Sequence, residues 1–375
     1  MKRTCLALAT MGVSLVAQAQ SSVTLYGRLD AGIEYMSGLP NATYTGSTSR
    51  WRAEGGDWGT SLWGLLGTED IGGGSKVIFK LENGFDVTNG TGGNFFNRWA
   101  TVAIDNDKYG TLRLGRMPFI SNGAWDFDPF AQSIWASASL DRGRNWPLSA
   151  NNISYQSPRI AGFDVYGQYS LSNATAWNGN GSTPQGRQAG LQLTYTNALF
   201  QLRGTYDEIR NPTTGSLGDV AVNSPNGPFA YGREYFAGVN VFLGPVKLQA
   251  VYQASRTSGE IGVPFGTATT TDHEWGGITW QATPYTSLTG AVYHINGNNG
   301  AGNATIYTLG GAYFLSKSTQ LDFQVAALRN SKSANFSLQP NATAGRGGGT
   351  GADYNANPLP GHGQFGTYVS IQHSF

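Results

Sequence analysis

Glycine-rich motifs and scattered histidines are the residues of this 375-residue chain that most resemble sites of chemistry. Residues 361–366 match the G-x-G-x-x-G pattern that holds a dinucleotide, but they lead into a strand pattern near the chain end, with no room for a βαβ unit. Residues 72–76 lack the spacer of a phosphate-binding loop and are typical of a hairpin turn. The histidines lack the spacing of metal ligands: His273, His294, His362 and His373. The sequence therefore predicts no cofactor, no metal site and no nucleotide site.

Nucleophilic catalysis is also not expected. The single cysteine, Cys5, lies in residues 1–19, which read as an export signal with Lys2 and Arg3, an apolar stretch and the exit Ala17-Gln18-Ala19. The mature chain is then 20–375 and contains no thiol. No G-x-S-x-G elbow exposes a serine, so we expect no enzyme. An outer-membrane phospholipase or protease barrel is the enzymatic alternative.

Composition narrows the class of protein further. The 24 basic and 23 acidic residues give a net charge of +1, and losing Lys2 and Arg3 changes it to −1, so we expect no nucleic-acid partner. Charged residues are only 13% of the chain, and 53 residues are glycine. After the signal, no apolar run approaches the ~18 residues of a membrane helix. A large secreted β-protein and an outer-membrane barrel both remain open.

Hydrophobic alternation with a period of two supplies the elements that must position any site. From Val23 to Tyr35 apolar residues and glycine occupy the odd positions, and the even positions are mostly polar. The pattern recurs around residues 163–171, 200–207, 246–253 and 320–327. Reading strands wherever it holds predicts sixteen, at approximately 22–36, 59–69, 75–86, 98–105, 110–117, 151–157, 162–171, 188–196, 199–207, 234–243, 246–256, 273–283, 287–296, 305–315, 319–329 and 362–375.

The connections decide between the two β classes. Seven short turns alternate with eight long segments: about 37–58, 87–97, 118–150, 172–187, 208–233, 257–272, 297–304 and 330–361. Tight turns at one end and long loops at the other are typical of an up-and-down membrane barrel. Strands of about ten residues also match the ~9–11 that a tilted strand needs to cross a bilayer. We predict an all-β, 16-stranded antiparallel transmembrane β-barrel, and keep a secreted β-rich binding protein as the remote alternative.

Four ordered motifs resemble one known family. They are residues 23–28 (VTLYGR), 65–74 (LLGTEDIGGG), 109–116 (YGTLRLGR) and the terminal aromatic Phe375. They are similar to the general diffusion porins of Gram-negative outer membranes, and the nearest branch is beta-proteobacterial. The resemblance covers the whole mature chain. It implies a homotrimer of sixteen-stranded barrels in the cell outer membrane, each with its long third loop folded into the lumen.

The resemblance also implies a constriction between basic residues on the wall and carboxylates on the third loop, here 118–150. Arg28, Arg116 and Arg142 or Arg144 match the basic positions, and Asp126 and Asp128 match the acidic tip. Leu62 and Leu66 stand where the family commonly has Arg and Lys, so fewer basic residues are expected on the wall beside the constriction. Strand alternation adds residues expected to line the lumen: Lys80, Arg113, Arg203 and Glu82.

A channel of this kind needs no chemical step. Opposed charges across a water-filled slit favour small hydrophilic solutes and ions, and the clustered arginines suggest a weak anion preference. Trp125, Trp135 and Trp146 on the third loop keep open a substrate-selective porin for sugars or organic anions. The expected partners are two further copies of the chain, outer-membrane lipid and lipopolysaccharide, and the barrel-assembly machinery, with Phe375 as the insertion signal.

Overall fold

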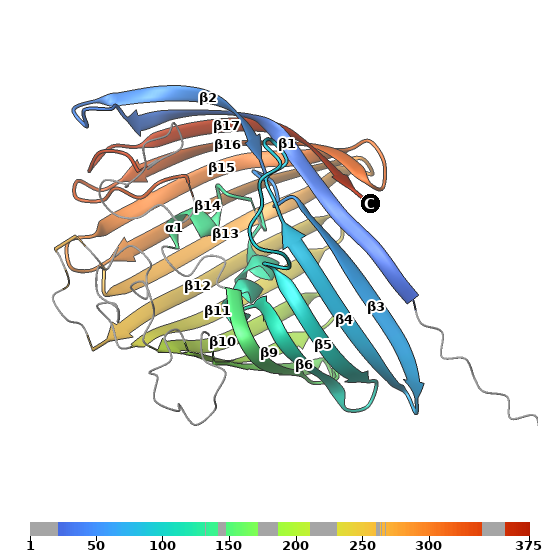
Figure 1. Ribbon diagram of the computed structural model, residues 1–375. Helices are drawn as coiled ribbons and strands as arrows, with labels where there is room; N and C mark the ends of the chain where they lie inside the picture. Colours follow the sequence, from blue (N-terminus) through green and yellow to red (C-terminus); the bar gives the residue numbers. More distant parts are fainter. Residues whose placement is uncertain are drawn as a thin grey trace, which may run out of the picture.

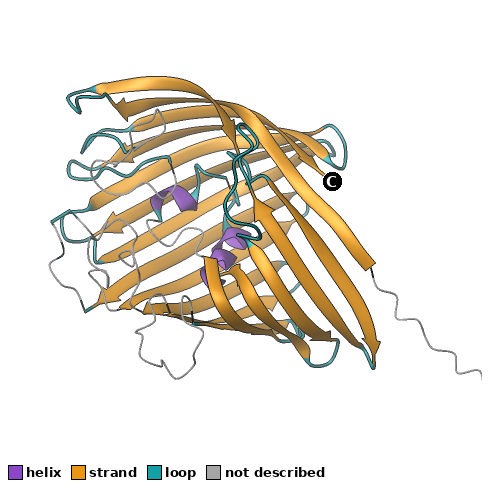
Figure 2. Ribbon diagram, in the orientation of Figure 1, coloured by secondary structure: helices purple, strands orange, loops and turns teal. Residues whose placement is uncertain are grey.

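The chain folds into one large β-sheet with almost no helix (Figures 1 and 2). The computed structural model describes residues 22–131, 133–141, 148–171, 187–210, 231–259, 263, 265–266, 268–339 and 357–375. The predicted export signal at 1–19 lies outside them. None of the described helices has the length and apolar character needed to cross a membrane. The helices are η1 (Ile120–Phe127) and α1 (Ser137–Leu140), and the strands are β1 (Ser22–Pro40), β2 (Ser47–Gly55), β3 (Leu62–Gly72), β4 (Ser75–Gly84), β5 (Trp99–Asn106), β6 (Gly110–Pro118), β7 (Leu148–Gln156), β8 (Phe163–Ser170), β9 (Arg187–Thr196), β10 (Phe200–Arg210), β11 (Tyr231–Leu243), β12 (Val246–Ser258), β13 (Thr270–Thr283), β14 (Thr286–Gly297), β15 (Gly302–Phe314), β16 (Thr319–Asn330) and β17 (Gln364–Ser374).

The sheet closes on itself through its first strand. From β3 onward each strand pairs antiparallel with the next, as far as β17. The first part of β1 pairs with β3, and the part from Arg28 to Ser37 pairs with β17. Setting β2 aside, the ring contains sixteen strands, so the predicted sixteen-stranded antiparallel barrel is confirmed. Closure leaves no unpaired edge, which a hydrocarbon environment would not tolerate.

The seventeenth strand, β2, corrects the prediction that residues 37–58 are all loop. It pairs with the second half of β1, from Ala31 opposite Gly55 to Pro40 opposite Ser47. Its apolar signal is short, because only Trp51 and Ala53 alternate with Arg50, Arg52 and Glu54. Two apolar residues give too little period-two signal to predict a strand, and pairing with β1 stabilises it instead.

The outward face of the barrel is apolar and exposed, and the inward face carries buried polar residues, as expected for a membrane protein. Val23, Leu25 and Ile33 of β1 are 57–63% exposed, whereas the intervening Asp30 and Glu34 are fully buried. The same inversion recurs on β12 and β16, where outward Leu248 and Val325 are exposed and inward Gln249 and Asp322 are buried. An outward apolar face fits a lipid environment, so the alternation is that of a transmembrane barrel and not of a soluble sandwich.

The last residue takes part in the closure of the ring. Gly27 N–H donates to the Phe375 carbonyl oxygen at 2.9 Å, and Phe375 N–H donates to the Gly27 carbonyl oxygen at 3.1 Å. The Phe375 ring lies over Gly27, and a Cβ added at Gly27 would lie 2.3 Å from that ring. A glycine at this position of β1 therefore allows the terminal aromatic to dock on the neighbouring strand.

Candidate functional site

The segment between β6 and β7 is held against inward-facing side chains of the opposite strands. Asn240 Nδ2 of β11 and Gln249 Nε2 of β12 donate to the Asp126 carbonyl oxygen at 3.1 and 3.3 Å. Trp275 Nε1 of β13 donates to the Phe127 carbonyl oxygen at 3.1 Å. Gln324 Nε2 of β16 donates to the Trp135 carbonyl oxygen at 2.9 Å. These bonds satisfy loop carbonyls that would otherwise be buried without donors.

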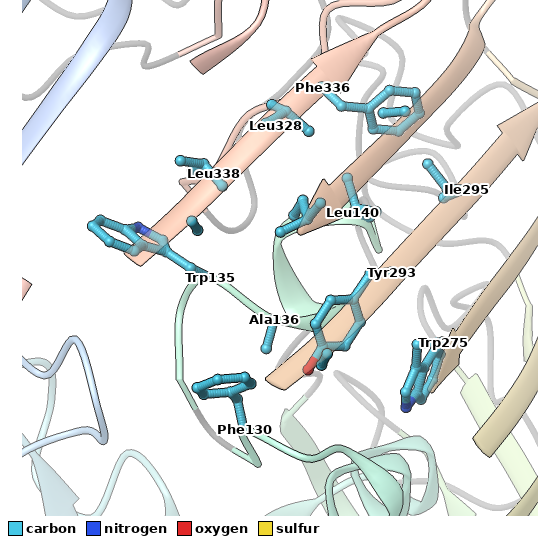
Figure 3. Packing of buried hydrophobic residues seen from close by; sticks show 14 of the residues in the cluster. Phe130, Trp135, Ala136, Leu140, Trp275, Tyr293, Ile295, Leu328, Phe336 and Leu338 are labelled. Carbon is cyan, nitrogen blue, oxygen red and sulfur yellow. The ribbon is translucent and has the colours of Figure 1, made fainter. Parts of the chain in front are cut away.

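An apolar core reinforces the same attachment (Figure 3). Trp135 of the segment is fully buried, and its ring lies 4.9 Å from that of Tyr368 on β17. Phe127 packs against Phe236 of β11, with ring centroids 5.7 Å apart. The strands contribute inward apolar residues to this core: Phe236, Val251, Trp275, Tyr293, Ile295, Ile306 and Leu328. The sequence analysis missed this core, although apolar residues on both faces of these strands were its signal.

Asp128, predicted with Asp126 at the acidic tip of the constriction, is buried in this attachment. It is 3% exposed and accepts hydrogen bonds from Tyr293 Oη at 2.5 Å, Phe130 N–H at 2.8 Å and Ser137 N–H at 3.0 Å. Burial raises the pKa of the Asp128 carboxyl, and the bonds from Ser137 and Tyr293 partly oppose this rise. The side chain fixes the turn of the segment, because three donors converge on its two oxygens.

Asp126 does face the lumen, but it is paired. Its side chain is 61% exposed, and Arg203 Nη1 of β10 lies 2.5 Å from its Oδ2. The same nitrogen donates to the Gly123 carbonyl oxygen at 2.8 Å, and the guanidinium lies over the Phe127 ring. Two predicted residues, one acidic and one basic, are therefore brought together, and each largely cancels the charge of the other.

Four cations gather on the opposite side, and we call Arg28, Lys80, Arg98 and Arg113 the basic wall. Arg98 Nε and Lys80 Nζ lie 2.7 and 3.3 Å from the Glu82 carboxylate. Arg28 Nε donates to the Thr60 carbonyl oxygen at 3.0 Å, and Arg113 Nη1 donates to Thr101 Oγ1 at 3.1 Å. The predicted lumen residues Lys80, Glu82 and Arg113 thus lie on the inward face, in a group with more positive than negative charge.

Arg98 is the member of the basic wall that the sequence analysis missed. Strict alternation from the buried Thr101 puts residue 98 on the outward face of the predicted strand. In the structure β5 begins at Trp99, so Arg98 lies outside the strand and its side chain does not follow the strand alternation. A lone polar residue next to an irregular turn leaves no periodic signal in the sequence.

Arg116 and the arginines that follow it are not brought into the basic wall. Arg116 pairs with Ala100, and its Nε donates to the Asn97 carbonyl oxygen at 2.7 Å. The pairing of β6 with β7 shifts register between Gly115 and Met117, so the alternation from Arg113 does not fix the face of Arg116, and its constriction role stays a prediction. Arg142 and Arg144 lie outside the described residues.

Two cavities meet at the start of the segment. One, of about 490 Å³, is lined by Arg98, Asn122 and Trp125 and lies towards the long-loop end. The other, of about 410 Å³, is lined by Trp99, Arg113, Asp126 and Arg203 and extends towards the short turns. Both include Pro118 and Asn122, so this part of the segment separates two open spaces of the lumen. Of the three loop tryptophans, only Trp125 is seen to line a cavity, since Trp135 is buried and Trp146 is outside the described residues.

Comparison with known proteins gives one consistent result. A family model described as Gram-negative porin matches residues 4–333. An outer membrane porin protein of Bordetella pertussis is 31% identical over 284 residues, covering 70% of this chain and 71% of that protein. Outer membrane porin protein 32 of Delftia acidovorans is 29% identical over 391 residues, covering 100% of both. The solved structure of an anion-selective porin from Comamonas acidovorans has a TM-score of 0.77 at 24% identity, covering 95% of this chain and 100% of that one.

Proposed function

The chain belongs to the Gram-negative porin family, and on that premise we propose that it conducts small hydrophilic solutes and ions passively, with a preference for anions. It is an outer-membrane β-barrel, and proteins of this family are channels and not enzymes. Solutes move down their own concentration gradient, so the residues of the lumen select by charge and size alone.

The unequal pairing of charges across the lumen is the observation that carries the anion preference. In the basic wall, Lys80 and Arg98 share one carboxylate, Glu82, and Arg28 and Arg113 add two further positive charges, which are within the electrostatic reach of Asp30, Asp322 and Asp105. On the loop side, Asp126 is held by Arg203 and Asp128 is buried, so neither offers a free negative charge to the water. A slit with excess positive charge and low-dielectric walls concentrates anions and repels cations.

The same proposal gives the third loop its role. We infer that residues 118–126 narrow the channel, because two cavities adjoin them and both are bordered by Pro118 and Asn122. Arg142 and Arg144 are proposed to add positive charge where the loop returns to the wall. A passing anion would then move along the basic wall from the cavity with Trp125 to the cavity with Trp99.

The proposal includes the assembly and export of the chain. We propose that residues 1–19 are removed after export and that residues 20–375 form the barrel, as a homotrimer in contact with outer-membrane lipid and lipopolysaccharide. Phe375 is proposed as the signal that the barrel-assembly machinery reads. Phe375 is 51% exposed, which is compatible with recognition by that machinery. In the folded barrel its backbone bonds to Gly27 help to join the last strand to the first.

Planar-bilayer recording under a KCl gradient tests the anion preference. The reversal potential of the wild type should have the sign of an anion-selective pore, and the double variant Lys80→Gln/Arg113→Gln should lower the anion-to-cation permeability ratio roughly threefold or more. Arg159→Gln is the matched control, because Arg159 is 55% exposed and lies at a short turn. A wild-type pore selective for cations would refute the preference but leave the channel itself intact.

A selective uptake of organic anions is the second candidate, and one cluster favours it. Lys80 Nζ lies 4.2 Å and the Arg113 guanidinium 5.7 Å from the Trp99 ring centroid, and Trp99 and Arg113 line the cavity of about 410 Å³. An aromatic face between two cations suits a carboxylate with a planar body. Benzoate should then block chloride current at lower concentration than acetate, and a Trp99→Ala variant should lose this difference.

A further inference from the structure

Three carboxylates converge at the hairpin of β1 and β2. They belong to Glu34 of β1, Glu54 of β2 and Asp57, which follows β2. One oxygen from each lies within 4.8 Å of the others. Glu34 is fully buried, Asp57 is 2% exposed and the Glu54 side chain is 21% exposed.

Asp57 is the unusual member of this cluster. Both of its carboxylate oxygens are buried, and within the described part of the chain neither accepts a hydrogen bond. Asp30 and Asp128, which are equally buried, accept bonds from backbone N–H groups: from Trp58 and Gly59 for Asp30, and from Phe130 and Ser137 for Asp128. A buried ionised carboxylate without a donor is strongly unfavourable, so a proton or a group outside the described residues must satisfy it.

The arginines of β2 do not supply that group. Arg52 Nε lies 2.9 Å from Glu34 Oε1 and 2.5 Å from Glu54 Oε2, and Arg50 Nη2 lies 3.5 Å from Glu34 Oε1. Both therefore pair with the glutamates, and Arg52 acts on Asp57 through its charge without donating a hydrogen bond to the Asp57 oxygens. Two guanidinium groups and three carboxylates leave one negative charge at the position that has no donor.

We propose that Glu34, Glu54 and Asp57 together bind one divalent cation of the oxygen-preferring class, with Ca²⁺ as the representative. Ca²⁺ binds carboxylate oxygens at about 2.3–2.6 Å, so two ligands on opposite sides of the ion lie roughly 5 Å apart. The 4.8 Å limit on the oxygen separations matches this span without movement of the backbone. The site does not depend on the solute preference proposed above. It goes beyond the expectation of no metal site, which considered histidine spacing alone.

A cation at this position would act on the third loop. The Asp57 carbonyl oxygen accepts a hydrogen bond from Ile134 N–H at 3.0 Å, and the Trp58 ring packs edge-on against Phe130 at 6.0 Å. The loop that supplies Asp57 therefore also supports the segment between β6 and β7, through one hydrogen bond and one aromatic contact. An ion that neutralises Asp57 would hold this loop in place and reduce fluctuations of the open-channel current.

Terbium luminescence on the folded, detergent-purified protein tests the site. After EDTA treatment, Tb³⁺ should bind at one site per chain, sensitised by Trp58 next to Asp57, and Ca²⁺ should displace it. Asp57→Asn should weaken the affinity about tenfold or more, because one of three ligand charges is lost. Glu208→Gln is the matched control: Glu208 also lies between two arginines, Arg210 and Arg233, but belongs to no described carboxylate group of this kind.

The outcomes separate binding from its alternatives. Equal Tb³⁺ affinity in the wild type, Asp57→Asn and Glu208→Gln would mean adventitious surface binding and would refute the site. Absence of any Ca²⁺-displaceable Tb³⁺ in the wild type would mean that the carboxylates share a proton instead. If Asp57→Asn fails to reach the folded, heat-modifiable form, Glu54→Gln replaces it, because the Glu54 side chain is partly exposed, and the same loss of affinity is expected.

Discussion

Asp126 and Asp128 show how two identical residues in one turn acquire different roles. Asp126 projects into the lumen and pairs with Arg203, whereas Asp128 is enclosed by Tyr293 and two backbone N–H groups. Their spacing of two residues predicts neither role, since the turn is irregular and not a strand. The partner groups come from β10 and β14, far away in sequence, and only the folded barrel brings them near.

Removing the Asp126 carboxylate should raise the anion preference. In Asp126→Asn, Arg203 loses its negative partner and adds an uncompensated positive charge to the slit. The anion-to-cation permeability ratio should increase roughly twofold, the size expected for a partly exposed ion pair. Reversal potentials in a KCl gradient measure it. An unchanged ratio in Asp126→Asn would show that the pair lies outside the path of the ions.

Asp57 should make stability depend on pH when divalent cations are absent. Burial raises its pKa well above the ordinary value of 3.8, and Glu34, Glu54 and Asp30 raise it further against the opposing Arg52. A raised pKa favours the protonated form in the folded state. The contribution of Asp57 to the free energy of unfolding in EDTA should therefore be most favourable at low pH and fall as pH rises from about 3.8 through the raised value, by at most about 1.4 kcal/mol per pH unit.

The measurement is denaturant unfolding in detergent at several pH values, with wild type and Asp57→Asn side by side. The variant should lack this part of the slope, and added Ca²⁺ should reduce it in the wild type. Identical slopes for both proteins in EDTA would contradict the assignment to Asp57.

At the scale of elements, hydrophobic alternation predicted the strands of the barrel well, because each spanning strand must present apolar side chains to the lipid. Val23, Leu25 and Ile33 repeat every second residue since each outward side chain meets hydrocarbon, and this constraint reaches every spanning strand. β2 was not predicted because its alternation contains only two apolar residues, Trp51 and Ala53, and Arg98 was not predicted because it lies just before β5 begins at Trp99. The wall could thus be predicted from the sequence. The loop core and the placement of Asp128 depend on long-range packing.

Trp135 should be the strongest single attachment of the third loop. Its side chain is fully buried against Tyr368, so Trp135→Ala removes a large apolar contact worth about 3 kcal/mol or more. We expect noisier open-channel current and faster proteolysis within residues 119–141. Trp280→Ala is the control, since Trp280 lies 48% exposed on the outward face of β13. Equal noise in both variants would show that Trp135 does not hold the loop.

At the scale of the whole molecule, the joint between the first and last strands decides whether a barrel exists. Gly27→Val should impair closure, because a Cβ at this position would lie 2.3 Å from the Phe375 ring and 2.8 Å from the Leu62 carbonyl oxygen. The yield of heat-modifiable folded protein should fall several-fold. Gly204→Ala is the matched control, since its added Cβ meets no atom within 4 Å. Full folding of Gly27→Val would show that the barrel closes even when the Phe375 side chain is displaced.

The apolar core described above also divides the lumen unequally. Strands β11 to β17 and the third loop share that core, whereas the two cavities border mainly β3 to β10. One half of the wall is thus committed to packing, and the other half meets water. Substitutions at Lys80, Trp99 or Arg113 can alter which solutes pass without disturbing the packed half. The barrel therefore offers a region where new transport specificity can be engineered at little expense of stability.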